Sequence, residues 1–325
     1  MRHPDPMSEN PSRRSFLKRV GLAAAALGGR AVYGQTAGAG ADLPPSSPPP
    51  VTIDAHVHVW KKDPQFPWAL ETKNPPSRDA TAEELLALMQ ACGVHRTVII
   101  QVIHYRWDNR YAASILKRYP QRFRGVARVN PEDPAAPDQL SRLVEEDGFH
   151  GVRLSPSGEA SGDWIRGPLM PPLWARCRDL KVPMTVLAPV SRMPEVMRLA
   201  QQFPDLTVVI DHMADCPLDQ PRELEKLLAL QRFPRIYVKI SHTWSLSAQP
   251  YPYLDSQRQV RRLYDTFGPR RLIAGSDWPI SLPFCTYAQA IDLARYRVDF
   301  LSPEDKRWIC GLSAAQVWPS LEGSV

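Results

Sequence analysis

From residue 51 onward, short runs of β-branched and apolar residues alternate with segments whose apolar residues recur every three or four positions. Runs that are apolar on both faces, such as residues 97–103, are typical of parallel strands buried on both sides. The segments between them have the spacing of helices with one buried face. The pattern therefore predicts a chain of repeated strand–helix units.

The segment 81–92 illustrates one predicted helix. Thr81 and Glu84 have the spacing of a capping box. Apolar residues follow at positions 85, 88, 89 and 92, which share one helical face. Gly93 stands where a left-handed residue commonly ends a helix.

Eight strands are expected near residues 51–57, 96–103, 123–129, 149–154, 182–187, 206–211, 236–240 and 271–275. Helical patterns lie at 81–92, 109–119, 135–147, 169–180, 193–203, 221–231 and 255–267, after 286, and after a cap at Ser302. Eight such units predict a single-domain α/β fold, the (β/α)8 TIM barrel. An open doubly wound sheet usually has a glycine-rich phosphate loop after its first strand, whereas here histidines follow.

The chain begins with the pattern of a twin-arginine signal peptide, which we expect over residues 1–39. Arg13 and Arg14 precede Phe16 and a short apolar run at 20–29, and small residues at 37–39 offer a cleavage site. Residues 40–50 form a Pro-rich linker. The barrel domain then covers 51–325, and we expect a periplasmic or secreted protein without a stable membrane anchor after cleavage.

The positive charge of the chain is concentrated in the predicted signal. Residues 1–39 hold six of the 40 Lys and Arg residues and two of the 34 Asp and Glu residues, which leaves the rest with a formal net charge of +2. This balance gives no reason to expect a nucleic-acid partner. The five cysteines are scattered without a CxxC pair, so we expect reduced thiols, with one disulfide left open.

Polar residues gather at the ends of the predicted strands. Five of the eight histidines do so: His56, His58, His104, His212 and His242. His56 and His58 lie two apart on a strand, so their side chains share one face. Arg153 ends the fourth strand and Asp277 follows the eighth. Because the carboxyl ends of barrel strands meet at one rim, these residues predict a common functional site.

Five segments, "TIDAHVHVW", "FHGVRLSP", "VVIDHMA", "VKIS" and "LIAGSDWP", occur in an order that resembles the amidohydrolase superfamily. More narrowly, they resemble its fuconolactonase and 2-pyrone-4,6-dicarboxylate lactonase branch. The similarity runs from about residue 51 to 318. It implies a hydrolase that opens lactones of sugar acids or of aromatic-degradation intermediates.

The resemblance also bears on metal binding. Members with two metals carry a lysine on strand four and histidines on strands five and six, whereas this chain has Arg153 and no histidine at 182–187. His56, His58, His212 and Asp277 remain, a set that can hold one divalent cation, zinc first among them. Catalysis without metal stays open, because some lactonases of this branch need none.

The expected catalytic roles follow from the chemistry of lactone opening. Asp277 is the candidate general base that activates water. His56, His58 and His212 would polarise the carbonyl, directly or through a metal. Arg153 would bind a substrate carboxylate or oxygen. Further candidates for substrate contact are Arg106, His104, His242, Trp60, Tyr105 and Trp278.

Two residues are expected to have supporting roles in the barrel. We expect Asp211 to orient His212 or a neighbouring group. Lys239 could have a functional role at the strand end or, equally, form a salt bridge inside the barrel.

Two other functions remain open at this point. One is a metal-dependent decarboxylase of aromatic or unsaturated acids, which resembles this barrel but usually has a histidine on strand five. The other is a binding protein or an inactive enzyme on the same fold. The expected substrate is a small lactone or carboxylic acid, and the sequence leaves the oligomeric state open.

Overall fold

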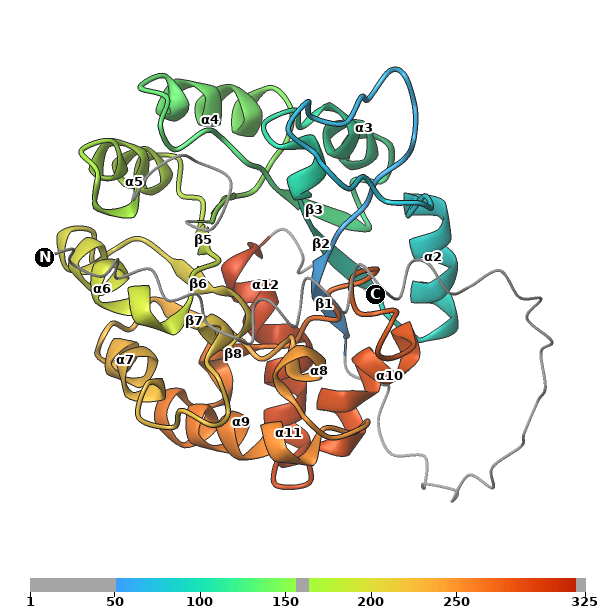
Figure 1. Cartoon of the computed structure of the whole chain (residues 1–325), viewed down its shortest axis with the longest axis vertical. Helices are drawn as coiled ribbons and strands as arrows, with labels where there is room; N and C mark the ends of the chain where they lie inside the picture. The colour runs from blue at the N-terminus through green and yellow to red at the C-terminus, as the bar shows by residue number, and fades with distance from the viewer. Residues whose placement is uncertain (1–50, 156–163, 320–325) are drawn as a thin grey trace, which may run out of the picture. The chain divides into compact units, whose positions relative to one another are not determined.

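Eight parallel strands lie at the centre of the computed structural model, which describes residues 51–155 and 164–319 (Figure 1). They are β1 (Ile53–Val57), β2 (Arg96–Ile100), β3 (Phe123–Val126), β4 (Val152–Leu154), β5 (Met184–Val186), β6 (Val208–Ile210), β7 (Ile236–Lys239) and β8 (Leu272–Ile273). Each lies within its predicted range. The predicted signal peptide (1–39) and linker (40–50) lie outside the described residues.

The strands form a closed ring. Strands β1–β2–β3 pair in one sheet and β4 through β8 in another, every pair parallel. A parallel bridge between Ala127 and Val152 joins β3 to β4, and a second between Val57 and Trp278 joins the end of β8 to β1. The structure therefore confirms the predicted barrel.

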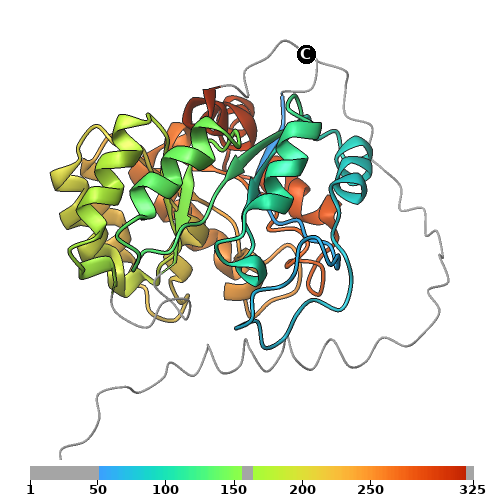
Figure 2. The same ribbon diagram turned by 90° about the horizontal axis from the view of Figure 1, so that it is seen from above.

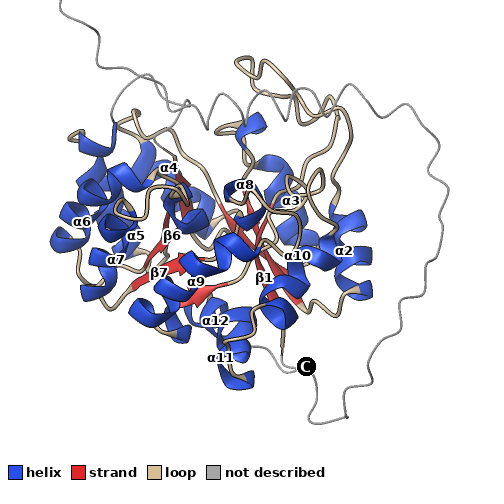
Figure 3. Cartoon of the chain, turned by 60° about the horizontal axis from the view of Figure 1, so that its bottom comes forward, coloured by secondary structure: helices blue, strands red, loops and turns tan. Residues whose placement is uncertain are grey.

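Helices surround the ring (Figure 3). They are α2 (Ala82–Ala91), α3 (Arg110–Arg118), α4 (Ala136–Glu145), α5 (Met170–Asp179), α6 (Met193–Gln202), α7 (Leu224–Leu228), α8 (Thr243–Leu246), α9 (Leu254–Phe267), α10 (Tyr287–Asp292), α11 (Pro303–Arg307) and α12 (Ser313–Val317). The helix expected at 221–231 is shorter, because α7 passes into a 3₁₀ turn at Ala229–Arg232.

The ends of α2 match the sequence signals in part. Gly93 has φ +61°, the left-handed conformation expected at the end of the helix. The Thr81 hydroxyl accepts a hydrogen bond from the Glu84 backbone N–H at 3.2 Å. The Glu84 carboxylate binds Arg78 instead of completing the capping box. Both halves of a capping box are present at Ser302 and Asp305.

Helix α12 closes the end of the barrel where the strands begin (Figure 2). Its Ala314, Ala315 and Val317, with the adjacent Trp318, join one buried cluster with inward-facing side chains such as Ala55 and Val209. Because this apolar plug fills one end, polar chemistry is confined to the opposite end, where the strands finish.

The five cysteines lie in the described residues and form no disulfide there; all but Cys92 are buried. This agrees with the expected reduced thiols. Among residues 51–155 and 164–319, none of the helices has the length and apolar character to cross a membrane.

Gly275 lies where β8 approaches β1 closely. A Cβ at this position would come within 2.8 Å of the His56 Cβ. We expect Gly275→Ala to lower the free energy of unfolding by about 1–3 kcal/mol, because neither backbone can move freely. We also expect a loss of activity, since His56 must shift.

The matched control is Gly93→Ala. A Cβ there meets no atom within 4 Å, but the backbone has φ +61°. This variant should lose stability while keeping its activity per folded molecule. Thermal unfolding and steady-state kinetics of both variants make the comparison, and a fully active Gly275→Ala would contradict the expectation.

Candidate active site

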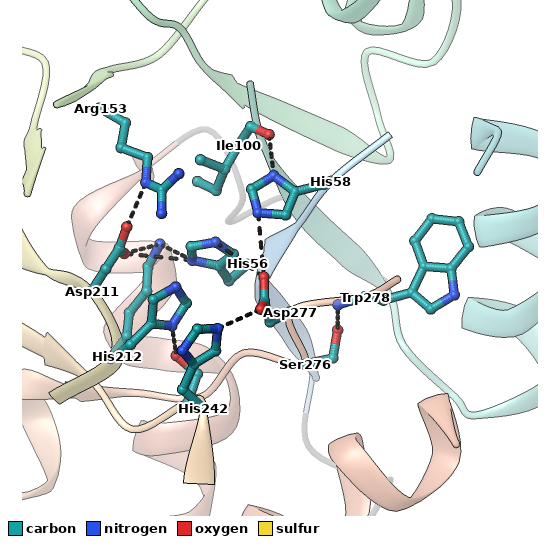
Figure 4. A network of polar contacts seen from close by, with 12 residues as sticks. His56, His58, Ile100, Arg153, Asp211, His212, His242, Ser276, Asp277 and Trp278 are labelled. Atoms are coloured by element: carbon teal, nitrogen blue, oxygen red, sulfur yellow. Dashed lines mark hydrogen bonds and ion pairs between the residues drawn. The ribbon is translucent and has the colours of Figure 1, made fainter. Parts of the chain in front are cut away.

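His56, on β1, and His58, directly after it, point toward a single carboxylate at the carboxyl end of the barrel (Figure 4). Their Nε2 atoms lie 3.5 and 3.3 Å from Oδ1 of Asp277. Strand geometry puts both imidazoles on one face, as the sequence predicted. The predicted meeting of strand-one histidines with the late aspartate is therefore confirmed.

Asp277 is held in a left-handed conformation in the segment after β8, with φ +56°. Its backbone N–H donates to the His56 carbonyl at 2.9 Å. The residues on either side of Asp277 are held as well. The Ser276 hydroxyl donates to Asp54 at 2.6 Å and accepts from the backbone N–H of Trp278 at 3.0 Å. Asp54 thus ties the turn to β1, a role that sequence reasoning missed although Asp54 lies two residues before His56.

His212 completes the cluster from the segment after β6. It lies in Asp211–Asp215, where residues from His212 onward have positive φ. Its ring centroid is 4.5 Å from that of His56, and its Nδ1 lies 2.8 Å from the Ser241 hydroxyl. Potential ligand atoms of His56, His212 and Asp277 all lie within 4.8 Å of one another.

His242 lies against Asp277. Its Nε2 is 2.6 Å from Asp277 Oδ2, and its Nδ1 is 3.2 Å from Asp215 Oδ1. The ring stacks on His212 with a centroid distance of 3.6 Å and an interplanar angle of 8°. Since both nitrogens face carboxylates, both donate, and the ring is an imidazolium.

The electrostatics of these groups follow from burial and neighbours. Burial alone would lower the pKa of His242, but Asp277 and Asp215 raise it to about 10. Burial opposes ionisation of Asp277, yet the charge of His242 keeps the pKa of Asp277 well below its usual range. Burial and Lys239 lower the pKa of His56 to about 3, so this imidazole is neutral.

A buried ion cluster lies beneath the histidines. Asp211 lies 3.0 Å from Lys239 Nζ and accepts a hydrogen bond from Arg153 Nε at 2.8 Å. Its Oδ1 also lies 3.4 Å from His56 Nδ1. The predicted salt bridge of Lys239 is present, and Asp211 contacts His56 and not His212, whose Nδ1 is bound by Ser241.

The two neighbours of His56 Nδ1 favour opposite tautomers. Lys239 Nζ, 3.1 Å away, can only donate, whereas the Asp211 carboxylate can only accept. A proton on Nδ1 facing Asp211 leaves the Nε2 lone pair free for a metal. A proton on Nε2 leaves an N–H donor facing the site. The same residues are thus compatible with metal-bound and metal-free states.

The donor atoms fit a divalent cation. His58 Nδ1 donates to the Ile100 carbonyl at 2.8 Å, so a ring that carries its only proton on Nδ1 presents its Nε2 lone pair toward Asp277. His56 Nε2 and Asp277 Oδ1 are buried without a hydrogen-bond partner among the described residues. Lone pairs facing a carboxylate require a proton or a cation between them. The chemistry of this donor set therefore suits a divalent metal.

Three aromatic residues expected to contact substrate belong to the core. Trp278 has 0% exposure, because the turn that points Asp277 inward directs the next side chain outward between strands and helices. Trp60 donates from Nε1 to the Arg78 carbonyl, and Tyr105 donates its hydroxyl to the Lys61 carbonyl. All three lie in one buried cluster, which corrects their predicted role.

The remaining predicted contacts lie after β2. His104 is half-buried and packs edge-to-face against Trp60 and Trp68. Arg106 is half-buried, with Nε 3.5 Å from Glu71.

Arg128, at the end of the third strand, was missed by the sequence analysis, although its position after β3 is the same signal that indicated Arg153. It is 1% exposed and its guanidinium lies 5.8 Å from the Trp107 ring centroid.

A closed ring of parallel strands with histidines and an aspartate at its carboxyl end has the architecture of a barrel enzyme. The chain belongs to the amidohydrolase family, whose model, described as "Amidohydrolase", matches residues 53–319. The resemblance seen in the sequence is therefore confirmed.

Curated relatives of the chain include two hydrolases. It is 30% identical over 234 residues to an L-fucono-1,5-lactonase of Burkholderia ambifaria, covering 70% of this chain and 80% of the relative. It is 28% identical over 251 residues to a 2-pyrone-4,6-dicarboxylate hydrolase of Comamonas testosteroni, covering 72% of this chain and 80% of the relative. A solved amidohydrolase of Burkholderia multivorans with bound zinc has a TM-score of 0.67 at 22% identity, covering 83% of this chain and 99% of the other.

Proposed function

We propose that this protein hydrolyses a lactone, with Asp277 as the general base that activates water. One observation carries the proposal: Asp277 Oδ1 is buried without a hydrogen-bond partner among the described residues and faces Nε2 of His56 and His58. The other oxygen, Oδ2, is bound by His242. The carboxylate is thereby ionised and has one oxygen free to accept a proton.

The relatives support this reaction, since those named above are a lactonase and a hydrolase of a cyclic ester. The decarboxylase alternative is less well supported. Strand β5 (Met184–Val186) carries no histidine, whereas decarboxylases of this barrel usually have one there. Hydrolysis is therefore the function that the site supports best.

The proposed reaction begins when Asp277 takes a proton from water and the oxygen adds to the lactone carbonyl carbon. In the tautomer with its proton on Nε2, His56 donates to the carbonyl oxygen and stabilises its developing negative charge. His212 can do the same, since Ser241 binds its Nδ1. The ring C–O bond then breaks, and the proton held by Asp277 passes to the leaving alkoxide. The product is a hydroxy acid.

Arg153 is placed to bind an anionic group of the substrate. Its Nε is bound to Asp211, while its two terminal amino groups make no hydrogen bond to the described residues. A guanidinium edge of this kind binds a carboxylate in a bidentate manner. We therefore propose a small lactone or related acid that carries a carboxylate or an equivalent oxygen.

We further propose that His56, His58, His212 and Asp277 hold one zinc ion; Asp277 Oδ1 has two lone pairs, so it would bind the ion with one and still accept a proton with the other. Two atoms bound at about 2.1 Å to a tetrahedral zinc lie about 3.4 Å apart. The His56 and His58 Nε2 atoms lie 3.5 and 3.3 Å from Asp277 Oδ1, close to that spacing. A divalent ion held by these residues would supply Lewis-acid polarisation and lower the pKa of nearby water.

We expect the protein purified from zinc-supplemented cells to contain about one zinc per chain, and His212→Ala to lose it. Elemental analysis gives the stoichiometry, and the thermal midpoint with and without a chelator gives a readout that does not depend on turnover. Ser114→Ala, distant on α3, is the matched control. A protein that takes up no zinc and keeps its activity after chelation would remove the metal from the proposal.

A panel of lactones tests the function directly. Acid release followed with a pH indicator should show turnover on at least one sugar or muconolactone-type lactone. Carbon dioxide release from aromatic acids, without lactone hydrolysis, would assign the decarboxylase function instead.

We also propose that residues 1–39 direct the folded protein to the periplasm through the twin-arginine route. The supporting pattern is Arg13 and Arg14 followed by an apolar run at 20–29. Fractionation of cells that express the full chain or Arg14→Lys tests this location.

A further inference from the structure

Asp215 lies at the end of the segment that follows β6, outside the residues that the sequence indicated as functional. Its carboxylate Oδ1 lies 3.2 Å from Nδ1 of His242. The opposite nitrogen, Nε2, donates to Asp277 Oδ2 at 2.6 Å. The ring of His242 is therefore held by one carboxylate at each nitrogen, with Asp215 on the side away from Asp277.

We propose that Asp215 is a positioning residue, which fixes the ring of His242 so that Asp277 presents its free oxygen, Oδ1, to the substrate. The inference rests on the proposed function of Asp277 as the general base. It adds a residue to the site that acts only through His242.

The stacking of His242 on His212 does not define which ring edge faces Asp277, so the hydrogen bonds of the ring to Asp277 and Asp215 decide it together. Stacking on His212, with ring centroids 3.6 Å apart and an interplanar angle of 8°, fixes the plane of the ring. A half-turn about the Cβ–Cγ bond keeps that plane but exchanges nitrogen for carbon at the edge toward Asp277. A hydrogen bond from Nδ1 to Asp215 selects one of the two orientations, because a flip would break both charged hydrogen bonds.

The backbone at both residues supports a specific arrangement. Asp215 has φ 45° and His242 has φ 65°, left-handed backbone conformations that residues other than glycine rarely adopt. Such conformations persist where surrounding contacts determine them. Here they bring the segment after β6 and the segment after β7 together over Asp277.

A purely structural role for Asp215 is distinguishable from positioning. Its side chain is 40% exposed, so its removal leaves no buried cavity and no unpaired buried charge from Asp215 itself. We expect Asp215→Ala to fold. The matched control is Asp219→Ala, an exposed aspartate four residues further along the chain.

We expect Asp215→Ala to lower kcat by about 10–100-fold, the range typical of residues that orient a reacting group, with KM changed less than about twofold. Asp215→Asn should retain most of the rate, because its amide oxygen accepts the same hydrogen bond. Asp219→Ala should match the wild type. In a His242→Gln background, Asp215→Ala should not lower kcat any further, since Asp215 acts only through His242.

An NMR measurement on histidine-labelled protein tests the orientation without any substrate. Low-field signals from both N–H groups of His242 should be present in the wild type and Asp215→Asn, and lost in Asp215→Ala. The inference is overturned if Asp215→Ala keeps these signals or an unchanged kcat, or if its effect persists beside His242→Gln. If no lactone is hydrolysed by the wild type, the proposed function fails, and the NMR signals alone decide the placement of His242.

Discussion

Asp277→Asn is expected to leave a folded protein whose lactone hydrolysis is about 10²–10⁴-fold slower than that of the wild type, the contribution typical of a general base. Asparagine has nearly the shape of aspartate and its oxygen still accepts the hydrogen bond from His242 Nε2. It offers an amide N–H₂ or a neutral oxygen to the water, and neither accepts a proton at neutral pH. The loss of activity should therefore appear in kcat; removing the counter-charge of the buried His242 ring also lowers stability, so activity is compared per folded molecule.

The measurement is kcat and KM on the best lactone of the panel, together with the thermal midpoint of the variant. Asp219→Asn, which changes the charge equally at an exposed position, is the control. Turnover at the wild-type rate by Asp277→Asn would assign the base to another residue and withdraw the mechanism.

Asp211→Asn is expected to lower the free energy of unfolding by about 3–5 kcal/mol, the cost of breaking a buried ion pair by removing one partner. Asp211 has 0% exposure and is the shared counter-charge of Lys239 and Arg153, at 3.0 and 2.8 Å. Its loss leaves two cations buried in the barrel without this partner. Burial lowers the pKa of Lys239, and Asp211 is the main group that opposes this shift.

Lys239→Met is the informative comparison. It removes one cation, but Asp211 keeps its hydrogen bond from Arg153, so we expect a smaller loss of stability than for Asp211→Asn. Urea unfolding of both variants measures the difference. Equal losses, or a loss below about 1 kcal/mol for Asp211→Asn, would show that the cluster does not stabilise the barrel as proposed.

The sequence predicted the barrel because its signals are local. A run that is apolar on both faces, such as 97–103, indicates a buried parallel strand whatever lies elsewhere in the chain. The left-handed Gly93 and the cap at Ser302 are likewise set by a few neighbouring residues. The shared face of His56 and His58 follows from strand geometry alone.

The contacts across strands were less predictable. Sequence reasoning placed Trp278 at the substrate, yet it lies in the core, and the contact of His242 with Asp277 was not foreseen. Asp215, Asp54 and Arg128 were missed. Arg128 follows β3 and could have been found by its position, whereas Asp215 and the role of Asp54 depend on how the turns after β6 and β8 bend, and positive φ at non-glycine residues there has no sequence signature that reveals it.

The sequence by itself thus determined which strands form the ring and which side chains reach its carboxyl end, since periodicity of two or 3.6 residues fixes the direction of a side chain. The tertiary structure decided which of these groups touch. Asp211 contacts His56 and Lys239, and Asp277 faces two imidazoles with one oxygen while His242 binds the other. The physical reason is that such pairings depend on ångström-scale register between strands far apart in the chain, which only closure of the ring establishes.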